Sequence, residues 1–136
     1  TKNIDRIEWM LEKTMEIGLD SVTFVQTQYG ERAHVNMERL RKILVAALKQ
    51  SMQCHLPPIY GPISLAEAVE SAQQWRCFVA DMPIPPCPTL AESIAPTGRY
   101  GVFVGPEGGF SEEELQFFQQ SGIQRVSMGY NRLRTE

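Results

Sequence analysis

Apolar residues recur along the 136-residue chain with two spacings, one typical of helices and one of strands. Apolar positions three and four residues apart predict helices over 3–18, 36–52, 64–75 and 111–122. Short β-branched or continuously apolar runs predict strands within 21–27, 55–63, 76–81, 101–106 and 124–129. The proline-rich segment between the third and fourth strands, 82–99, is expected to form a surface loop with one short helix.

Local signals at the helix ends support this division. Gly18 follows the first helix as a terminating glycine, and Asn36 is a suitable N-cap for the second. Ser111 and Glu114 have the spacing of a capping box at the start of the last helix. Strands that alternate with helices predict an α/β fold with a mainly parallel sheet. The apolar runs 76–81 and 101–106 are expected to be covered on both faces.

Composition narrows the class of protein. The chain is 43% hydrophobic and 21% charged, as in ordinary globular domains, and no apolar run reaches the ~20 residues of a membrane helix. Cys54, Cys77 and Cys87 have no CxxC spacing, which predicts free thiols in a reducing cytoplasm. His34 and His55 stand in no ligand pattern, so no metal site is expected.

The net charge of −3 argues against broad nucleic-acid coating but leaves room for a local basic patch. Such a patch lies on the second helix, where we expect RNA phosphates to be bound by Arg39, Arg41 and Lys42. A second basic group near the end contains Arg125, Arg132 and Arg134. An ordinary solvated helix face explains the first patch equally well, and both interpretations stay open.

The stretch "GVFVGPEGGFSEEEL" at 101–115 combines a strand, a glycine turn and a helix start. Its glycines permit positive φ angles and close approach of a ligand to the backbone. Neither GxxxxGK[ST] nor GxGxxG is present, and Glu107 with the glutamates 112–114 disfavours a polyphosphate. A neutral adenosine or a positive sulfonium suits these charges better. A tight strand-to-helix turn without a ligand is the alternative.

The pair "GPEGGFSEEEL" and "MGYNRLRTE" resembles the paired motifs of the SPOUT-class RNA methyltransferases. It is most similar to the family that methylates a uridine of bacterial small-subunit ribosomal RNA at N3. The stretches "RIEWMLEKTMEIGLDSVTF" and "ERLRKILVAALKQSMQCHLPPI" also match that family, so the resemblance covers nearly the whole chain.

The resemblance implies a SPOUT-type α/β knot, which is a deep trefoil knot, with S-adenosylmethionine as methyl donor. It further implies a cytoplasmic homodimer that acts on 16S ribosomal RNA or the small ribosomal subunit. Residues 1–136 would form the methyltransferase domain. Family members carry an N-terminal β-rich RNA-binding domain and a final helix, which we expect to lie outside this stretch.

The resemblance also implies a cofactor site between the two motifs. One wall is expected from the backbone of Gly105, Pro106, Glu107 and Gly108, and the other from Met128, Gly129, Tyr130 and Leu133, with Ala80 closing the pocket. Arg134, with Arg132 beside it, is expected to stabilise the deprotonated uracil through a carbonyl oxygen. A structural ion pair of Arg134 with Glu107 or Glu136 is the alternative role for this arginine.

Two other functions compete with methyl transfer. A non-catalytic α/β module could bind an adenosine-type ligand or RNA without chemistry. A phosphate-handling α/β enzyme is disfavoured by the acidic turn.

Overall fold

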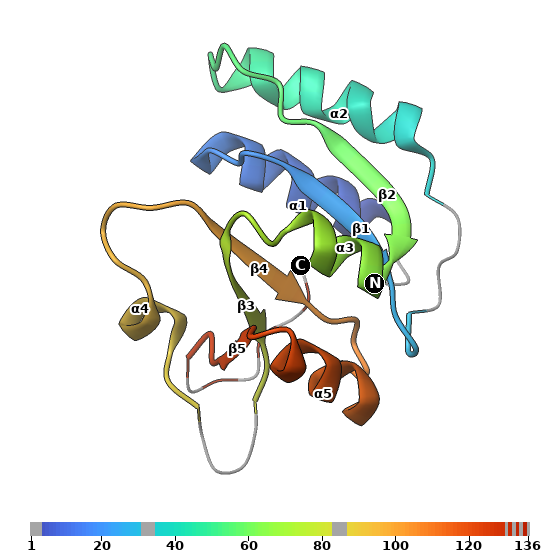
Figure 1. Cartoon of the computed structure of the whole chain (residues 1–136). Coiled ribbons are helices and arrows are strands. Elements are labelled where there is room, and N and C mark those ends of the chain that lie inside the picture. The colour runs from blue at the N-terminus through green and yellow to red at the C-terminus, as the bar shows by residue number, and fades with distance from the viewer. Residues whose placement is uncertain are drawn as a thin grey trace. The chain divides into compact units, whose positions relative to one another are not determined.

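The computed structural model describes residues 4–30, 35–82, 87–129, 131, 133 and 135 (Figure 1). Helices and strands follow one another in the expected order: α1 (Ile4–Ile17), β1 (Val22–Gln26), α2 (Met37–Gln50), β2 (Ile59–Ser64), α3 (Leu65–Ser71), β3 (Arg76–Ala80), α4 (Leu90–Ser93), β4 (Tyr100–Val104), α5 (Glu112–Gln120) and β5 (Gln124–Val126). The predicted N-cap of α2 and the predicted terminating glycine of α1 are both confirmed. Asn36 accepts a hydrogen bond from the backbone N–H of Arg39 at 3.0 Å, and Gly18 has φ +94° beyond α1.

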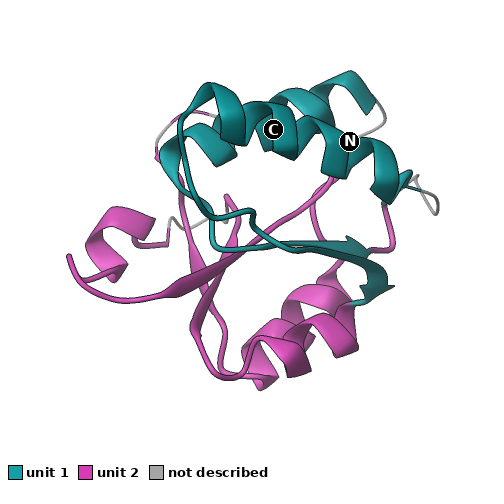
Figure 2. Ribbon diagram, turned by 90° about the horizontal axis from the view of Figure 1, so that it is seen from above, with its two compact units in different colours: residues 1–26, 30–64, 136 teal, residues 27–29, 65–135 magenta. Residues whose placement is uncertain are grey.

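The chain divides into two compact units (Figure 2). The first contains the described residues of 4–64 except 27–29, and the second contains 27–29 and the described residues from 65 to 135. Each unit has its own parallel sheet, so the expected parallel pairing is confirmed. The sequence predicts one sheet, but the described residues form two. One sheet pairs β1 with β2, and the other contains β4, β3 and β5.

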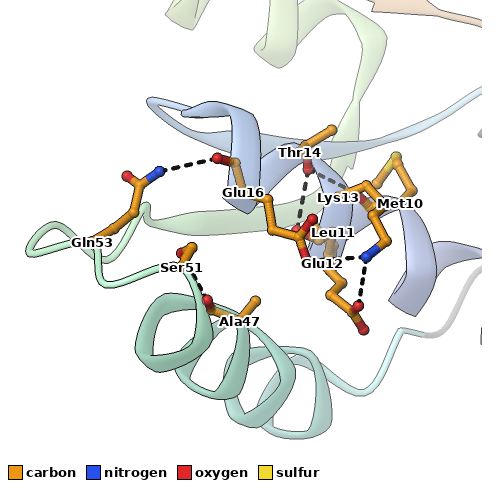
Figure 3. A network of polar contacts seen from close by, with 9 residues as sticks. All are labelled: Met10, Leu11, Glu12, Lys13, Thr14, Glu16, Ala47, Ser51 and Gln53. Atoms are coloured by element: carbon orange, nitrogen blue, oxygen red, sulfur yellow. Dashed lines mark hydrogen bonds and ion pairs between the residues drawn. The ribbon is translucent and has the colours of Figure 1, made fainter.

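In the first unit, α1 and α2 supply most of the buried core. Ile7, Leu11 and Met15 of α1 cluster with side chains of α2 and with Ile59 of β2. Polar contacts join the ends of the two helices (Figure 3). The side-chain amide of Gln53 donates to the carbonyl oxygens of Met15 and Glu16 at 3.1 and 3.3 Å, which satisfies two groups left open at the end of α1.

In the second unit, three parallel strands lie in the order β4-β3-β5. One face of this sheet packs against α3 and α5 through a cluster of buried residues: Val69, Ala72, Cys77, Val79, Leu115, Phe118 and Ile123. Phe118 is fully buried, and its ring centroid lies 4.9 Å from that of Phe103. This packing fixes α5 relative to the strand that precedes it.

Coverage on both faces is confirmed for β3 and wrong for β4. Three consecutive residues of β3 are buried, but Val102 and Val104 of β4 are 38% and 52% exposed. Successive side chains of a strand point to opposite faces, and β4 is the edge strand of its sheet. A continuous apolar run therefore did not distinguish a central strand from an edge strand.

The short strand β5 is enclosed by two successive parts of the chain. On one side the N–H of Asp81, just after β3, donates to the carbonyl of Val126 at 2.9 Å. On the other side Ser127 donates to Pro88 at 2.9 Å and accepts from Leu90 at 2.8 Å. Hydrogen bonds of neighbouring strand residues point to opposite edges. Residues 88–90 thus lie on the side of β5 that faces away from β3, although they precede β5 in the sequence.

Candidate functional site

The carboxyl ends of β3, β4 and β5 meet at one edge of the sheet of the second unit. Ala80, the last residue of β3, is in register with Val104 of β4 and Val126 of β5. The turns 105–110 and 127–129 therefore leave the same edge on the two sides of β3. At ~4.8 Å per strand spacing, the two turns begin about 10 Å apart. Ligands of open α/β sheets bind at such edges.

The turn after β4 is tight, because the lack of a side chain on Gly105 lets the Phe110 ring and the Gly109 backbone pack closely against it. A Cβ atom on Gly105 would lie 3.1 Å from the ring of Phe110 and 3.2 Å from the backbone of Gly109. Gly109 has φ +74° and donates its N–H to the carbonyl of Pro106 at 2.8 Å. The Phe110 ring packs edge-on against Phe118, with centroids 5.0 Å apart. The turn is thus anchored in the core, while Glu107 and Gly108 are exposed.

The helix after the turn begins with the predicted capping box. The hydroxyl of Ser111, a residue only 3% exposed, accepts from the N–H of Glu114 at 3.2 Å. The Glu114 carboxylate accepts from the N–H of Ser111 at 2.8 Å. These side-chain oxygens occupy the helix end where a phosphate would bind. The geometry therefore agrees with the absence of a phosphate-loop motif.

Residues just after β1 also belong to this site, although no motif in the sequence predicts a role for them. The N–H of Gln28 donates to the second carboxylate oxygen of Glu114 at 2.8 Å. A Cβ atom on Gly108 would lie 3.1 Å from the Cβ of Tyr29. Both contacts lie within the second unit, to which 27–29 belong. They join residues far apart in sequence, so only the tertiary fold could reveal them.

The turn after β5 is fixed by Ser127. Its hydroxyl donates to the carbonyl of Gly129 at 2.7 Å and accepts from the N–H of Gly129 at 3.0 Å. Gly129 has φ +130°, a region that favours glycine. Met128 and Leu133 are 49% and 61% exposed, which leaves their side chains available to an apolar part of a ligand.

The structure thus places Ala80, the turn from Gly105 to Gly108 and the pair Met128 and Gly129 along one edge. Tyr130, Arg132 and Arg134 lie outside the described residues, so their predicted roles stay predictions. Arg125, grouped with them by sequence, is engaged elsewhere: its Nε donates to Asp81 at 2.8 Å.

The predicted basic patch is partly neutralised by the first unit itself. Arg39 forms an ion pair with Glu8, with Nε 2.5 Å from one oxygen and Nη2 3.1 Å from the other. Lys42 pairs with Glu38 at 2.9 Å, and both side chains are highly exposed. Arg41 is exposed and makes no ion pair with another described residue.

Among the described residues, no three His, Cys, Asp or Glu side chains are grouped so that they could hold a metal ion. The helices of that same part of the chain include none with the length and apolar character needed to cross a membrane. A hollow of about 380 Å³ lies near the amino end of β3, where Trp75, Arg76 and Gln124 line it, away from the two turns.

A family model described as an RNA methyltransferase domain matches residues 1–136. The chain belongs to this family. The resemblance drawn from the paired motifs is therefore confirmed at the level of the family.

Relatives named as ribosomal RNA small subunit methyltransferases E align along nearly the whole chain. The Borreliella burgdorferi protein E 2 is 28% identical over 96% of this chain and 56% of its own length. The Aquifex aeolicus protein is 27% identical over 100% of this chain and 60% of its own length. The chain thus spans a little over half the length of these relatives.

Solved structures of the same kind have the same fold. The probable rRNA-methyltransferase from Porphyromonas gingivalis matches with a TM-score of 0.90 and 33% identity, over 99% of this chain and 58% of that one. A ribosomal RNA small subunit methyltransferase E from Neisseria gonorrhoeae, described as bound to S-adenosyl methionine, matches with a TM-score of 0.83 and 29% identity. That match covers 98% of this chain and 56% of that one.

Proposed function

We propose that residues 1–136 form the methyltransferase domain of an S-adenosylmethionine-dependent enzyme that methylates a uridine of 16S ribosomal RNA at N3. The observation that carries the proposal is the register of Ala80 with Val104 and Val126. It brings the acidic glycine turn and the turn after β5 to one edge of the sheet. The Neisseria relative described as bound to S-adenosyl methionine supports the choice of cofactor.

The residues at this edge suit the methyl donor. The backbone of Gly105 to Gly108 would form one wall, Met128 and Gly129 the other, and Ala80 the floor between them, with Tyr130 and Leu133 completing the site. Glu107, Glu112 and Glu113 are exposed around the turn and favour a cationic ligand over a phosphate. S-adenosylmethionine supplies an electrophilic methyl group when bound.

The protein's chemical task is to make the uracil nitrogen nucleophilic. N3 of uracil lies between two carbonyl groups and reacts only after its proton has left. A guanidinium hydrogen-bonded to a uracil carbonyl would lower the pKa of that nitrogen, and Arg134 is the proposed donor, with Arg132 as its neighbour. The RNA itself would be bound partly through Arg39, Arg41 and Lys42.

Three features implied by the resemblance are part of the proposal. The enclosure of β5 between β3 and residues 88–90 supports a trefoil knot, because the chain after β5 would leave through the surrounding segment. The three free cysteines agree with a cytoplasmic location. The homodimer rests on the family resemblance.

Calorimetry followed by a transfer assay tests the function. Micromolar binding of S-adenosylhomocysteine and no binding of ATP are expected. Transfer of a labelled methyl group to small ribosomal subunits should then place the label on uridine N3 by mass spectrometry. ATP binding at this edge would overturn the proposal, and cofactor binding without transfer would favour a non-catalytic binding module.

Arg134→Ala separates chemistry from binding. It should slow methyl transfer about 100-fold while the Kd for S-adenosylhomocysteine changes little. Equal losses in both measurements would remove the catalytic role of Arg134.

A further inference from the structure

Glu114 connects the start of α5 with the segment that follows β1. One carboxylate oxygen accepts from the N–H of Ser111 at the start of α5, and the other accepts from the N–H of Gln28 after β1, both at 2.8 Å. The capping box on α4 contains the same local arrangement, formed by Thr89 and Glu92. There the second bond of the glutamate is to the hydroxyl of Thr89 itself, so it connects nothing distant. Of these two boxes in the described part of the chain, the one on α5 also fixes a distant segment.

The segment held by Glu114 places Tyr29 against the glycine turn. The Cβ of Tyr29 would lie 3.1 Å from a Cβ on Gly108, and its Cγ would lie 3.5 Å away. Any larger residue at 108 would push Tyr29 outward. Tyr29 is nevertheless 51% exposed, so much of the residue faces solvent beside the turn.

We propose that Tyr29 is the stacking surface for the target base and that Glu114 is the residue that positions it. This inference rests on the proposed function. Unpaired RNA bases are commonly bound by stacking on exposed aromatic rings. Tyr29 lies beside Gly108, in one of the two turns that would hold the cofactor, so a base stacked on its ring would lie next to the methyl donor. A ring fixed in advance loses less conformational entropy when RNA binds.

The same contacts argue against a proton-transfer role for Glu114. Both of its oxygens already accept backbone N–H groups, so both are engaged in holding the main chain. The glutamate therefore acts through Tyr29 and not on the substrate.

Substitutions at Tyr29 test the stacking surface. With small ribosomal subunits as acceptor, Tyr29→Ala should raise the KM for RNA about 10-fold, and Tyr29→Phe should stay within about twofold of the parent. Neither variant should change the Kd for S-adenosylhomocysteine. If the parent transfers methyl groups and Tyr29→Ala has an unchanged KM, or loses cofactor affinity equally, the inference is wrong. A parent that transfers no methyl group contradicts the proposed function instead.

A matched pair of capping substitutions tests the positioning role. Glu114→Gln should speed amide hydrogen exchange at Gln28 and raise the KM for RNA. Glu92→Gln, which weakens an equivalent cap, should do neither. The double variant Glu114→Gln with Tyr29→Ala should be no worse in KM than Tyr29→Ala alone. Unchanged exchange at Gln28 in Glu114→Gln, or additive effects on KM, would overturn the assignment without any bearing on cofactor binding.

Discussion

Arg125 and Asp81 form an ion pair between β5 and the residue that follows β3. The guanidinium donates from Nε to Oδ2 at 2.8 Å, and Nη2 contacts the same oxygen. The two side chains are 37% and 25% exposed. The backbone N–H of Asp81 also donates to Val126, so side chain and main chain together fix the ends of two strands. The pair therefore stabilises the edge from which the turn after β5 departs.

Removal of this pair should have a modest cost. Asp81→Asn keeps the size of the side chain but loses its charge, and it should lower the free energy of unfolding by about 1 kcal/mol in urea titrations. Partial exposure keeps the cost below the 3–5 kcal/mol of a broken buried pair. The control is Glu38→Gln, whose partner Lys42 is highly exposed, and it should change stability by less than about 0.5 kcal/mol. Equal losses in the two variants would contradict this ranking.

Gly101 of β4 lies close to the side chain of Cys77 on the neighbouring strand β3. A Cβ atom on Gly101 would lie 2.7 Å from Sγ of Cys77 but 3.9 Å from its Cβ. Cys77 is buried, and its thiol donates weakly to the carbonyl of Ala72. Gly101→Ala should therefore lower the free energy of unfolding by about 1–3 kcal/mol, because the sulfur has to move.

Removal of the sulfur should relieve the overlap. In the Cys77→Ala background, Gly101→Ala meets only an ordinary contact between two Cβ atoms and should cost much less. A double-mutant cycle in urea measures this coupling. Strictly additive losses would show that the strain of Gly101→Ala lies elsewhere.

The three thiols should differ in reactivity. Burial raises the pKa of the Cys77 thiol, and partial burial raises the pKa of the Cys87 thiol, whereas Cys54 is exposed. Only the thiolate is alkylated, so iodoacetamide at pH 8 should modify Cys54 first, Cys87 more slowly and Cys77 last. Peptide mass spectrometry after timed quenching gives the three rates. The three thiols should be alkylated at comparable rates in urea and at distinct rates in buffer. Equal alkylation rates in buffer would contradict the burial of Cys77.

The same raised pKa values predict a loss of stability in alkali. The folded state favours the protonated thiols, because burial penalises the thiolate. Their stabilising contribution is complete below the ordinary thiol pKa and is lost as the pH rises through the folded pKa. Replacement of Cys77 and Cys87 by alanine should flatten the fall in stability on the alkaline side, as measured by urea titrations from pH 8 to 10. An unchanged slope would assign that fall to other groups.

Local features of the fold were predictable from sequence because they depend on neighbouring residues. The cap at Asn36, the glycine at 18 and the box of Ser111 and Glu114 each involve residues within one helical turn. The exposed face of β4 was not predictable, because it depends on which strand ends the sheet. The same limit applies to the site. The motifs indicated both turns, but the contact of Glu114 with Gln28 joins residues 86 positions apart.

The cations of the basic patch on α2 also differ in a way that only the tertiary structure reveals. By sequence Arg39, Arg41 and Lys42 are equivalent, but in the structure Arg39 and Lys42 have carboxylate partners. A cation already paired with a carboxylate releases fewer counterions when it meets a phosphate. Arg41→Gln should therefore weaken RNA binding most, and it should reduce the slope of log K against log salt by about 0.7–0.9.

Arg39→Gln serves as the contrast to Arg41→Gln. The Glu8 side chain is only 17% exposed and would lose its partner, so this variant should lower stability more than it lowers RNA affinity. Filter binding over a salt series, together with urea titrations, separates the two effects. If Arg39→Gln reduces the salt slope as much as Arg41→Gln does, the pair with Glu8 opens when RNA binds. If neither variant changes the slope, α2 is an ordinary solvated face and RNA contacts the protein elsewhere.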